Sequence, residues 1–270
     1  MDFGDIGTRG LVLLGCGKMG SAMLQGWLAA GLEPSAVTVI EPKPSQWLLG
    51  TGVNLSSDVP HAPAVVVVAV KPQMVAEALP ILFAMGGGGT VFLSIAAGTT
   101  LATYEQMLGD ATPVIRAMPN TPAAVGKGIT ALIGNGSVSS DKLELAERLL
   151  SVVGQTVRLE READMDAVTA VSGSGPAYVF HLIETLADAG RAEGLSPELA
   201  MQLAKATVAG AGALAEIAEE GPAQLRVNVT SPAGTTAAAL EVLMSESDGF
   251  PILMRRAVAA AAARSRELGK

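Results

Sequence analysis

Cysteine and histidine are scarce in this chain of 270 residues, which contains one cysteine and two histidines. A single cysteine excludes an internal disulfide, and two histidines are too few for a multi-histidine metal site. We therefore expect a protein without bound metal in a reducing compartment, and we predict that it is cytoplasmic. Cys16 lies inside a glycine-rich loop, and neither His61 nor His181 has sequence neighbours that indicate a Ser-His-Asp triad.

Aromatic and basic residues are also few. Aromatics make up 3% of the chain while apolar residues make up 49% and glycines number 31, so small aliphatic side chains must fill the interior. The 18 Lys and Arg residues against 26 Asp and Glu residues give a formal charge of −8, which repels phosphate backbones and anionic membranes. We expect a small-molecule substrate as partner rather than nucleic acid or a membrane.

Long uninterrupted hydrophobic segments are missing. Residues 78–104 carry no charge and are long enough to span a bilayer, but Pro80 and the run Gly86-Gly87-Gly88-Gly89 would break a spanning helix. Leu13-Leu14-Gly15-Cys16 is similar to the end of a lipoprotein signal, but the apolar run before the cysteine is too short. We therefore expect neither a membrane span nor a lipid anchor.

The first half of the chain alternates short apolar runs with helical stretches, which is typical of a parallel sheet. The apolar runs cover residues 10–14, 36–40, 64–70, 90–95, 113–118, 129–133 and 156–159. The run at 64–70 has no polar face, as expected for a central strand covered by helices on both sides. Helices are predicted over residues 21–30 and 141–153.

After about residue 160 the chain becomes alanine-rich with helical periodicity, within the usual boundary error of a few residues. The predicted helices cover residues 164–171, 176–193, 197–219, 235–245 and 251–268. Their faces of small residues have too little bulk to fill a core alone, so we expect them to contact a second subunit. We predict an α/β domain over residues 1–160 and a helical domain over residues 161–270.

Gly15-Cys16-Gly17-Lys18-Met19-Gly20 is a G-x-G-x-x-G motif between a predicted strand and a predicted helix. In this context the first glycine permits a sharp turn, the second lets a pyrophosphate approach the backbone, and the third lets helix and strand pack closely. The motif predicts a dinucleotide site. A glycine-rich turn without a ligand is the alternative.

Glu41 follows the second predicted strand at about the interval of 20 residues expected for an acid that binds the adenosine ribose. A carboxylate there favours NADH, because it would repel the 2′-phosphate of NADPH, although Lys43 is near enough to offset part of the charge. A solvated carboxylate at a strand end is the competing interpretation.

Other strand ends and two helix starts carry further candidates. Lys71 and the small residues of Ser94-Ile95-Ala96-Ala97-Gly98 follow strands, where open parallel sheets bind ligands. Residues 172–176 and 231–236 place hydroxyls and glycines before helices, an arrangement suited to a carboxylate. A surface lysine and ordinary helix caps are the alternatives for these segments.

Together these segments resemble the Δ1-pyrroline-5-carboxylate reductases, which catalyse the last step of proline biosynthesis. The resemblance rests on residues 15–20, 69–73, 94–98, 116–122, 172–178 and 231–240, in family order. It covers nearly the whole chain and implies a Rossmann-like parallel-sheet domain followed by an all-helical dimerisation domain. It further implies hydride transfer from NADPH or NADH to a cyclic imine, in a homodimer at least, with a higher assembly of dimers left open.

The resemblance also implies site residues. The cofactor would contact Gly15, Cys16, Gly17, Lys18, Met19, Gly20, Ala69, Val70, Lys71, Pro72, Ile95, Ala96 and Ala97. The substrate would lie near Glu162, Asn228, Gly234, Thr235 and Thr236. In this scheme residues 234–236 hold the substrate carboxylate, and the Thr236 hydroxyl acts on the ring nitrogen as the catalytic candidate. Glu41 stands where many relatives are neutral or basic, which puts a preference for NADPH in doubt.

Two other functions compete with this one. The β-hydroxyacid dehydrogenases share a glycine loop ending in Met-Gly but need a catalytic lysine, and residues 163–270 offer only Lys205 and Lys270. A non-catalytic dinucleotide-sensing protein could use the same fold, but Thr235 and Thr236 at a helix start argue against it.

Overall fold

The computed structural model describes residues 1–56 and 59–269, so Lys270 lies outside the described part. The chain forms two compact units, one of residues 1–173 with 262–270 and one of residues 174–261. Residues 161–173 join the first unit because Met165 and Ala170 are buried and the Asn120 amide donates a hydrogen bond to the Ser172 carbonyl at 3.1 Å. The predicted boundary at residue 160 between an α/β domain and a helical domain stays a prediction.

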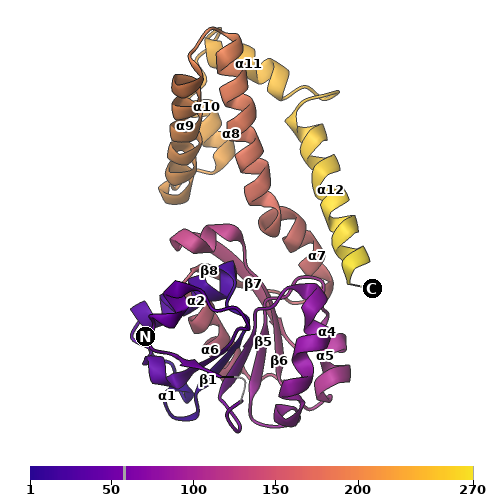
Figure 1. Cartoon of the computed structure of the whole chain (residues 1–270). Helices are drawn as coiled ribbons and strands as arrows, with labels where there is room; N and C mark the ends of the chain where they lie inside the picture. The colour runs from indigo at the N-terminus through magenta and orange to yellow at the C-terminus, as the bar shows by residue number, and fades with distance from the viewer. Residues whose placement is uncertain (57–58, 270) are drawn as a thin grey trace. The chain divides into compact units, whose positions relative to one another are not determined.

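The first unit is built on an eight-stranded sheet in the order β3-β2-β1-β4-β5-β6-β7-β8, in which only β6 and β7 pair antiparallel among the described strands (Figure 1). The strands are β1 (Leu11–Leu14), β2 (Val37–Ile40), β3 (Asn54–Leu55), β4 (Val65–Val68), β5 (Val91–Ser94), β6 (Val114–Met118), β7 (Gly128–Gly134) and β8 (Gly154–Arg158). The predicted fold class is confirmed, and every predicted strand is present. The strand order reverses between β1 and β4, because both β2 and β4 pair with β1.

Helices cover the two faces of this sheet. The helices of the first unit are α1 (Ile6–Arg9), α2 (Lys18–Ala29), α3 (Gln46–Leu49), α4 (Val75–Ala78), α5 (Leu101–Leu108), α6 (Ser140–Ser151) and α7 (Met165–Val168). The four valines of β4 are 0–1% exposed, as its continuous apolar run predicts for a strand covered on both sides.

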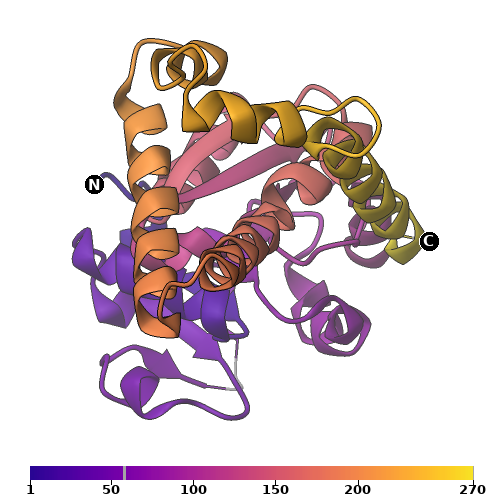
Figure 2. The same ribbon diagram turned by 90° about the horizontal axis from the view of Figure 1, so that it is seen from above.

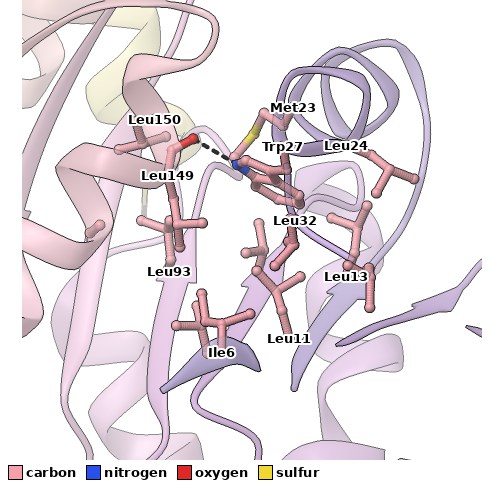
Figure 3. Close-up of a cluster of buried hydrophobic side chains, with 14 of the residues drawn as sticks. Ile6, Leu11, Leu13, Met23, Leu24, Trp27, Leu32, Leu93, Leu149 and Leu150 are labelled. Carbon is pink, nitrogen blue, oxygen red and sulfur yellow. Dashed lines mark hydrogen bonds between the residues drawn. The ribbon is translucent and has the colours of Figure 1, made fainter. Parts of the chain in front are cut away.

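One face of the sheet is covered by α2 and α6. Figure 3 shows the buried indole of Trp27 on α2 among aliphatic side chains such as Leu13 and Leu93. The indole Nε1–H donates to the Leu149 carbonyl of α6 at 2.8 Å. This bond satisfies the polar atom of the largest buried side chain and links the two helices. On the other face, Tyr104 of α5 lies in a second buried cluster with Val66, Val68 and Phe92.

The second unit is helical. It includes only the first part of the last helix, α12, because residues 262–270 belong to the first unit. The helices are α8 (Gly175–Ala192), α9 (Pro197–Ile217), α10 (Pro222–Asn228), α11 (Thr235–Leu243) and α12 (Phe250–Leu268). Figure 1 shows α8 beside α9, and Figure 2 shows these helices from above. The start of α9 is fixed by Pro197 and by the Ser196 hydroxyl, which accepts from the Leu199 N–H at 3.2 Å.

The buried cluster of this unit is small. It contains only Ala187, Ala200 and Ala204 among the described residues, with Ile183 and Met201 partly buried against it. No helix in the described residues is both long and apolar enough to cross a membrane.

Candidate functional site

The glycine loop between β1 and α2 turns sharply against the end of β4. Gly15 has φ +89°, and a Cβ atom there would lie 2.9 Å from Val70 Cγ1 and 3.0 Å from the carbonyl carbon of Ala69. Any side chain at this position would be strained and would clash with the neighbouring strand end. The backbone conformation and the neighbouring protein atoms therefore require glycine at this position, whether or not a ligand is bound.

Gly20 and Gly17 differ in what requires them. A Cβ on Gly20 would lie 2.6 Å from the Gly15 carbonyl oxygen, so this glycine lets α2 pack against the strand it follows. At Gly17 a Cβ would meet no protein atom within 4 Å. The open space beside Gly17 fits a ligand that approaches the backbone closely, which is the place of the pyrophosphate in this motif.

The start of α2 can bind an anion. Gly17 is its N-cap, and no side chain makes a capping hydrogen bond there. The backbone N–H groups of the first helical turn have no partner within the helix and carry its positive dipole end. Together with the space beside Gly17, they form a cradle that suits a diphosphate.

Glu41 lies next to this cradle at the end of β2. Its carboxylate accepts hydrogen bonds from the Cys16 N–H at 2.9 Å and from the Lys43 N–H at 3.0 Å. A cavity of about 380 Å³ adjoins it, lined by Val39, Ile40, Glu41, Pro42, Leu55 and Ser56. The two bonds fix the carboxylate between the glycine loop and a cavity that suits an adenosine group.

The thiol pKa of Cys16 is shifted from its ordinary value. Burial raises the pKa of its thiol to about 11, and the negative charge of Glu41 adds to the rise. The side chain is therefore a neutral thiol at physiological pH, which makes it a poor nucleophile.

The remaining predicted cofactor residues lie at the adjacent strand ends. The Ala69 N–H donates to the Leu14 carbonyl at 2.8 Å, and the Ile95 N–H donates to the Val68 carbonyl at 3.0 Å. The ends of β1, β4 and β5 thus form one continuous edge beside the strand-order reversal, where α/β sheets bind ligands. Lys71 and Pro72 are exposed at this edge, Ala96 is buried, and Ile95 and Ala97 are half-buried.

Glu162 already has partners in the first unit. Its Oε1 accepts hydrogen bonds from the Leu101 N–H at the start of α5 and from the buried Arg116 guanidinium, both at 2.8 Å. The carboxylate thereby caps α5 and pairs a charge that would otherwise be costly to bury. These contacts give Glu162 a structural task, and its contact with substrate stays a prediction.

The other predicted substrate residues lie in the second unit. Gly234 is the N-cap of α11, and a Cβ there would lie 2.3 Å from the Ser231 hydroxyl and 3.1 Å from the Ser231 carbonyl oxygen, so a side chain at this position would require the Ser231 hydroxyl to move. No side chain caps the helix start at Thr235 and Thr236. Asn228 is exposed, and its side-chain oxygen accepts from Gln224 Nε2 at 2.8 Å.

Sequence reasoning did not single out Tyr104, whose hydroxyl lies 2.6 Å from the Ser94 hydroxyl behind the end of β5. No motif contains this tyrosine; the only signal is that it is one of two in the chain. No group of three or more His, Cys, Asp or Glu side chains within residues 1–56 and 59–269 could hold a metal ion.

Comparisons with known proteins agree with this architecture. The family model described as pyrroline-5-carboxylate reductase dimerisation matches residues 162–268, and that described as NADP oxidoreductase coenzyme F420-dependent matches residues 10–98. The pyrroline-5-carboxylate reductase of Pseudomonas aeruginosa is 39% identical to this chain, over 97% of the chain and 98% of its own length. The corresponding protein of Synechocystis sp. is 42% identical, with coverages of 96% and 98%.

Solved structures of the same kind are also similar. A pyrroline-5-carboxylate reductase from Coxiella burnetii superposes with a TM-score of 0.89 at 34% identity, covering 97% of this chain and 99% of its own. The pyrroline carboxylate reductase from Plasmodium falciparum, solved with NADP bound, gives 0.82 at 31% identity, with coverages of 98% and 99%.

The raised pKa of Cys16 predicts slow alkylation. With a pKa of about 11, only about one thiol in a thousand is ionised at pH 8. We expect iodoacetamide to modify the folded protein about a hundredfold more slowly than the urea-unfolded chain at that pH, with the rate rising towards pH 11. Mass spectrometry follows the reaction, since Cys16 is the only cysteine.

Glu41→Gln removes the nearby charge and should lower the thiol pKa, which speeds the reaction at fixed pH. Lys43→Gln is the matched surface control and should leave the rate near that of the unmodified chain. An alkylation profile that Glu41→Gln does not move would contradict the electrostatic contribution of this carboxylate.

Proposed function

The chain belongs to the pyrroline-5-carboxylate reductase family, and on this premise we propose that it reduces L-1-pyrroline-5-carboxylate to L-proline with a hydride from NADH or NADPH. The observation that carries the proposal is the relatedness over almost the full length of chain and relatives alike. The glycine cradle at the strand-order reversal supports it, since it fits a pyridine dinucleotide.

The reaction needs little besides positioning. A protonated cyclic imine is already electrophilic at carbon, and the nicotinamide supplies the hydride with its electron pair, so that the C=N bond becomes C–N. The protein's task is to hold the two reactants in line and to place charge correctly. This task agrees with the site residues, which are mostly glycines, small side chains and hydroxyls.

The start of α11 is the proposed substrate site. The N–H groups of Gly234, Thr235 and Thr236 would bind the substrate carboxylate at the positive end of the helix dipole. The Thr236 hydroxyl would hydrogen-bond the ring nitrogen or relay its proton. Asn228 and Glu162 would complete the surroundings of the substrate.

Glu41 is the proposed selector of the dinucleotide. Two backbone N–H groups hold its carboxylate in place, so it can accept hydrogen bonds from both adenosine ribose hydroxyls but cannot turn away from a 2′-phosphate without losing them. We therefore infer a preference for NADH. We also propose a cytoplasmic location, as the sequence predicts.

The second unit is the proposed subunit interface. Phe180 and Leu186 of α8 are 59% and 42% exposed, and Phe250 and Leu253 of α12 are 44% and 49% exposed. Large apolar side chains in such number typically indicate a protein interface. A second copy of the chain would cover them and supply the core that the buried alanines cannot, giving a homodimer at least.

Steady-state reduction of pyrroline-5-carboxylate tests the activity and the cofactor together. We expect turnover with kcat/KM higher for NADH than for NADPH, and we expect Glu41→Gln to raise the NADPH to NADH ratio about tenfold by removing a like charge. Lys43→Gln is the control at the same loop and should not raise that ratio. Turnover that favours NADPH would overturn the role of Glu41, and no turnover with either dinucleotide would overturn the function.

Thr236→Val should lower kcat/KM for the imine at least tenfold, because it removes the hydroxyl while keeping the side-chain shape. Thr236→Ser restores a hydroxyl and should stay within a fewfold of the unmodified enzyme. Parallel titrations with NADH check that dinucleotide affinity is unchanged in both variants. Full activity in Thr236→Val would exclude a catalytic hydroxyl.

Phe180→Glu should weaken subunit association, since it places a charge in the proposed apolar interface. Sedimentation velocity over a dilution series should show the dissociation midpoint moving to at least tenfold higher concentration. Ile81→Glu is the control, because Ile81 is a comparably exposed apolar residue, 49% accessible, in the first unit. Equal behaviour of the two variants would contradict the proposed interface.

A further inference from the structure

A pair of buried hydroxyls lies behind the segment that follows β5. Ser94 ends that strand, Tyr104 belongs to α5, and both side chains are 0% exposed. Their oxygens lie 2.6 Å apart, and the Ser94 oxygen also accepts the Ala96 N–H at 3.2 Å. The pair therefore fixes the backbone of a segment in which Ile95 and Ala97 remain partly accessible.

Tyr104 is hydrogen-bonded to the start of this segment through Ser94. Burial raises the pKa of its phenol, while the hydrogen bond with Ser94 and the positive charge of Arg116 lower it in part. The Tyr104 hydroxyl thus holds the start of residues 95–98 through Ser94. The net rise keeps the phenol protonated, and the contact persists across neutral pH.

Helix α5 is itself firmly anchored. The Thr100 side chain caps it by accepting from the Thr103 N–H at 3.2 Å, and Glu162 accepts from the Leu101 N–H at 2.8 Å. Glu162 is in turn paired with the buried Arg116 of β6. The start of α5 is thus fixed by Thr100 and by the pair of Glu162 with Arg116, so the helix that carries Tyr104 is a rigid support for the turn.

The sheet order indicates which end of the dinucleotide this turn would serve. Glu41 and its adjoining cavity lie at β2 and β3, on one side of the reversal between β1 and β4. The turn after β5 lies on the other side. A dinucleotide with its pyrophosphate on the glycine loop crosses this reversal, so its nicotinamide half extends towards β4 and β5.

We propose that the Tyr104 and Ser94 hydroxyls are a positioning pair that shapes residues 95–97 for the nicotinamide half of the dinucleotide. The inference rests on the proposed function and extends it to residues that touch neither ligand, since both are fully buried. Loss of either hydroxyl would leave the adenosine half bound and the nicotinamide half poorly aligned for hydride transfer.

Tyr104→Phe and Ser94→Ala test the pair, because each removes one hydroxyl and little volume. With NADH and pyrroline-5-carboxylate we expect kcat to fall about tenfold, as small misalignments of reacting groups cause. NADH deuterated at the transferred position should show a larger isotope effect than in the unmodified enzyme. In binding titrations, the affinity for NADH should fall severalfold while that for ADP-ribose, which lacks the nicotinamide, stays constant.

Thr90→Val is the matched control. Its hydroxyl is also buried, 2% exposed, and donates to the Pro63 carbonyl at 2.7 Å just before β5, at the opposite end of that strand. This variant should lower the melting temperature similarly but leave kcat, the isotope effect and NADH affinity unchanged. Similar changes in all three variants would reduce the pair to a structural contact and overturn the proposal.

The binding comparison separates this proposal from the proposed function. If the unmodified protein bound NADH without reducing the imine, the function would fail, while a selective loss of NADH over ADP-ribose affinity would still support the pair. Unchanged NADH affinity and kcat in Tyr104→Phe would overturn the pair alone. If Tyr104→Phe does not fold, the same measurements of kcat, isotope effect and affinity on Ser94→Ala test the proposal.

Discussion

The close approach of the first strand–helix turn to the end of β4 is the constraint on which the first unit depends. Gly15 lets the turn lie against Ala69 and Val70, and Gly20 lets α2 start directly over the Gly15 carbonyl. The same helix carries Trp27 into the core, where it bonds to α6. A bulkier loop would therefore displace both the start of α2, which is the proposed anion site, and the buried face of that helix, so that the proposed site and the core share one steric requirement.

Polar groups around the proposed dinucleotide site are held in place by hydrogen bonds to backbone N–H groups or to buried side chains. The Glu41 carboxylate is held by two N–H groups, and the turn after β5 is held by Ser94 and Tyr104. Each arrangement removes conformational freedom before a ligand arrives, which reduces the entropy that binding must offset. The two supports lie on opposite sides of the strand-order reversal, so we expect the proposed selection of the adenosine half and the proposed orientation of the nicotinamide half to be independent of each other.

Local patterns were sufficient to predict seven of the eight strands of the first unit and its glycine loop. Continuous apolar runs located the strands, and glycine spacing located the loop, because both features reflect neighbours close in sequence. The pattern missed β3, whose two residues are exposed, the helices α1, α3, α4 and α5, which are four to eight residues long, and α10, which buries no residue. It also missed the pairing of Glu162 with Arg116 and the contact of Ser94 with Tyr104. The first joins residues 46 positions apart, and the second joins residues of different elements that only the fold brings together.

The second unit differs from the first in how little apolar surface it buries. A helical unit whose buried cluster is three alanines removes little apolar surface from water, and hydrophobic stabilisation scales with the area buried. Small side chains do, however, let helices approach closely, which makes long shared contacts with another chain favourable. We therefore expect the exposed aliphatic and aromatic residues of α8 and α12 to become part of a core that forms on the proposed association. The start of α11 lies in this unit. We therefore expect the rigidity of the proposed substrate site to depend on the partner subunit as well as on the chain that carries Thr235 and Thr236.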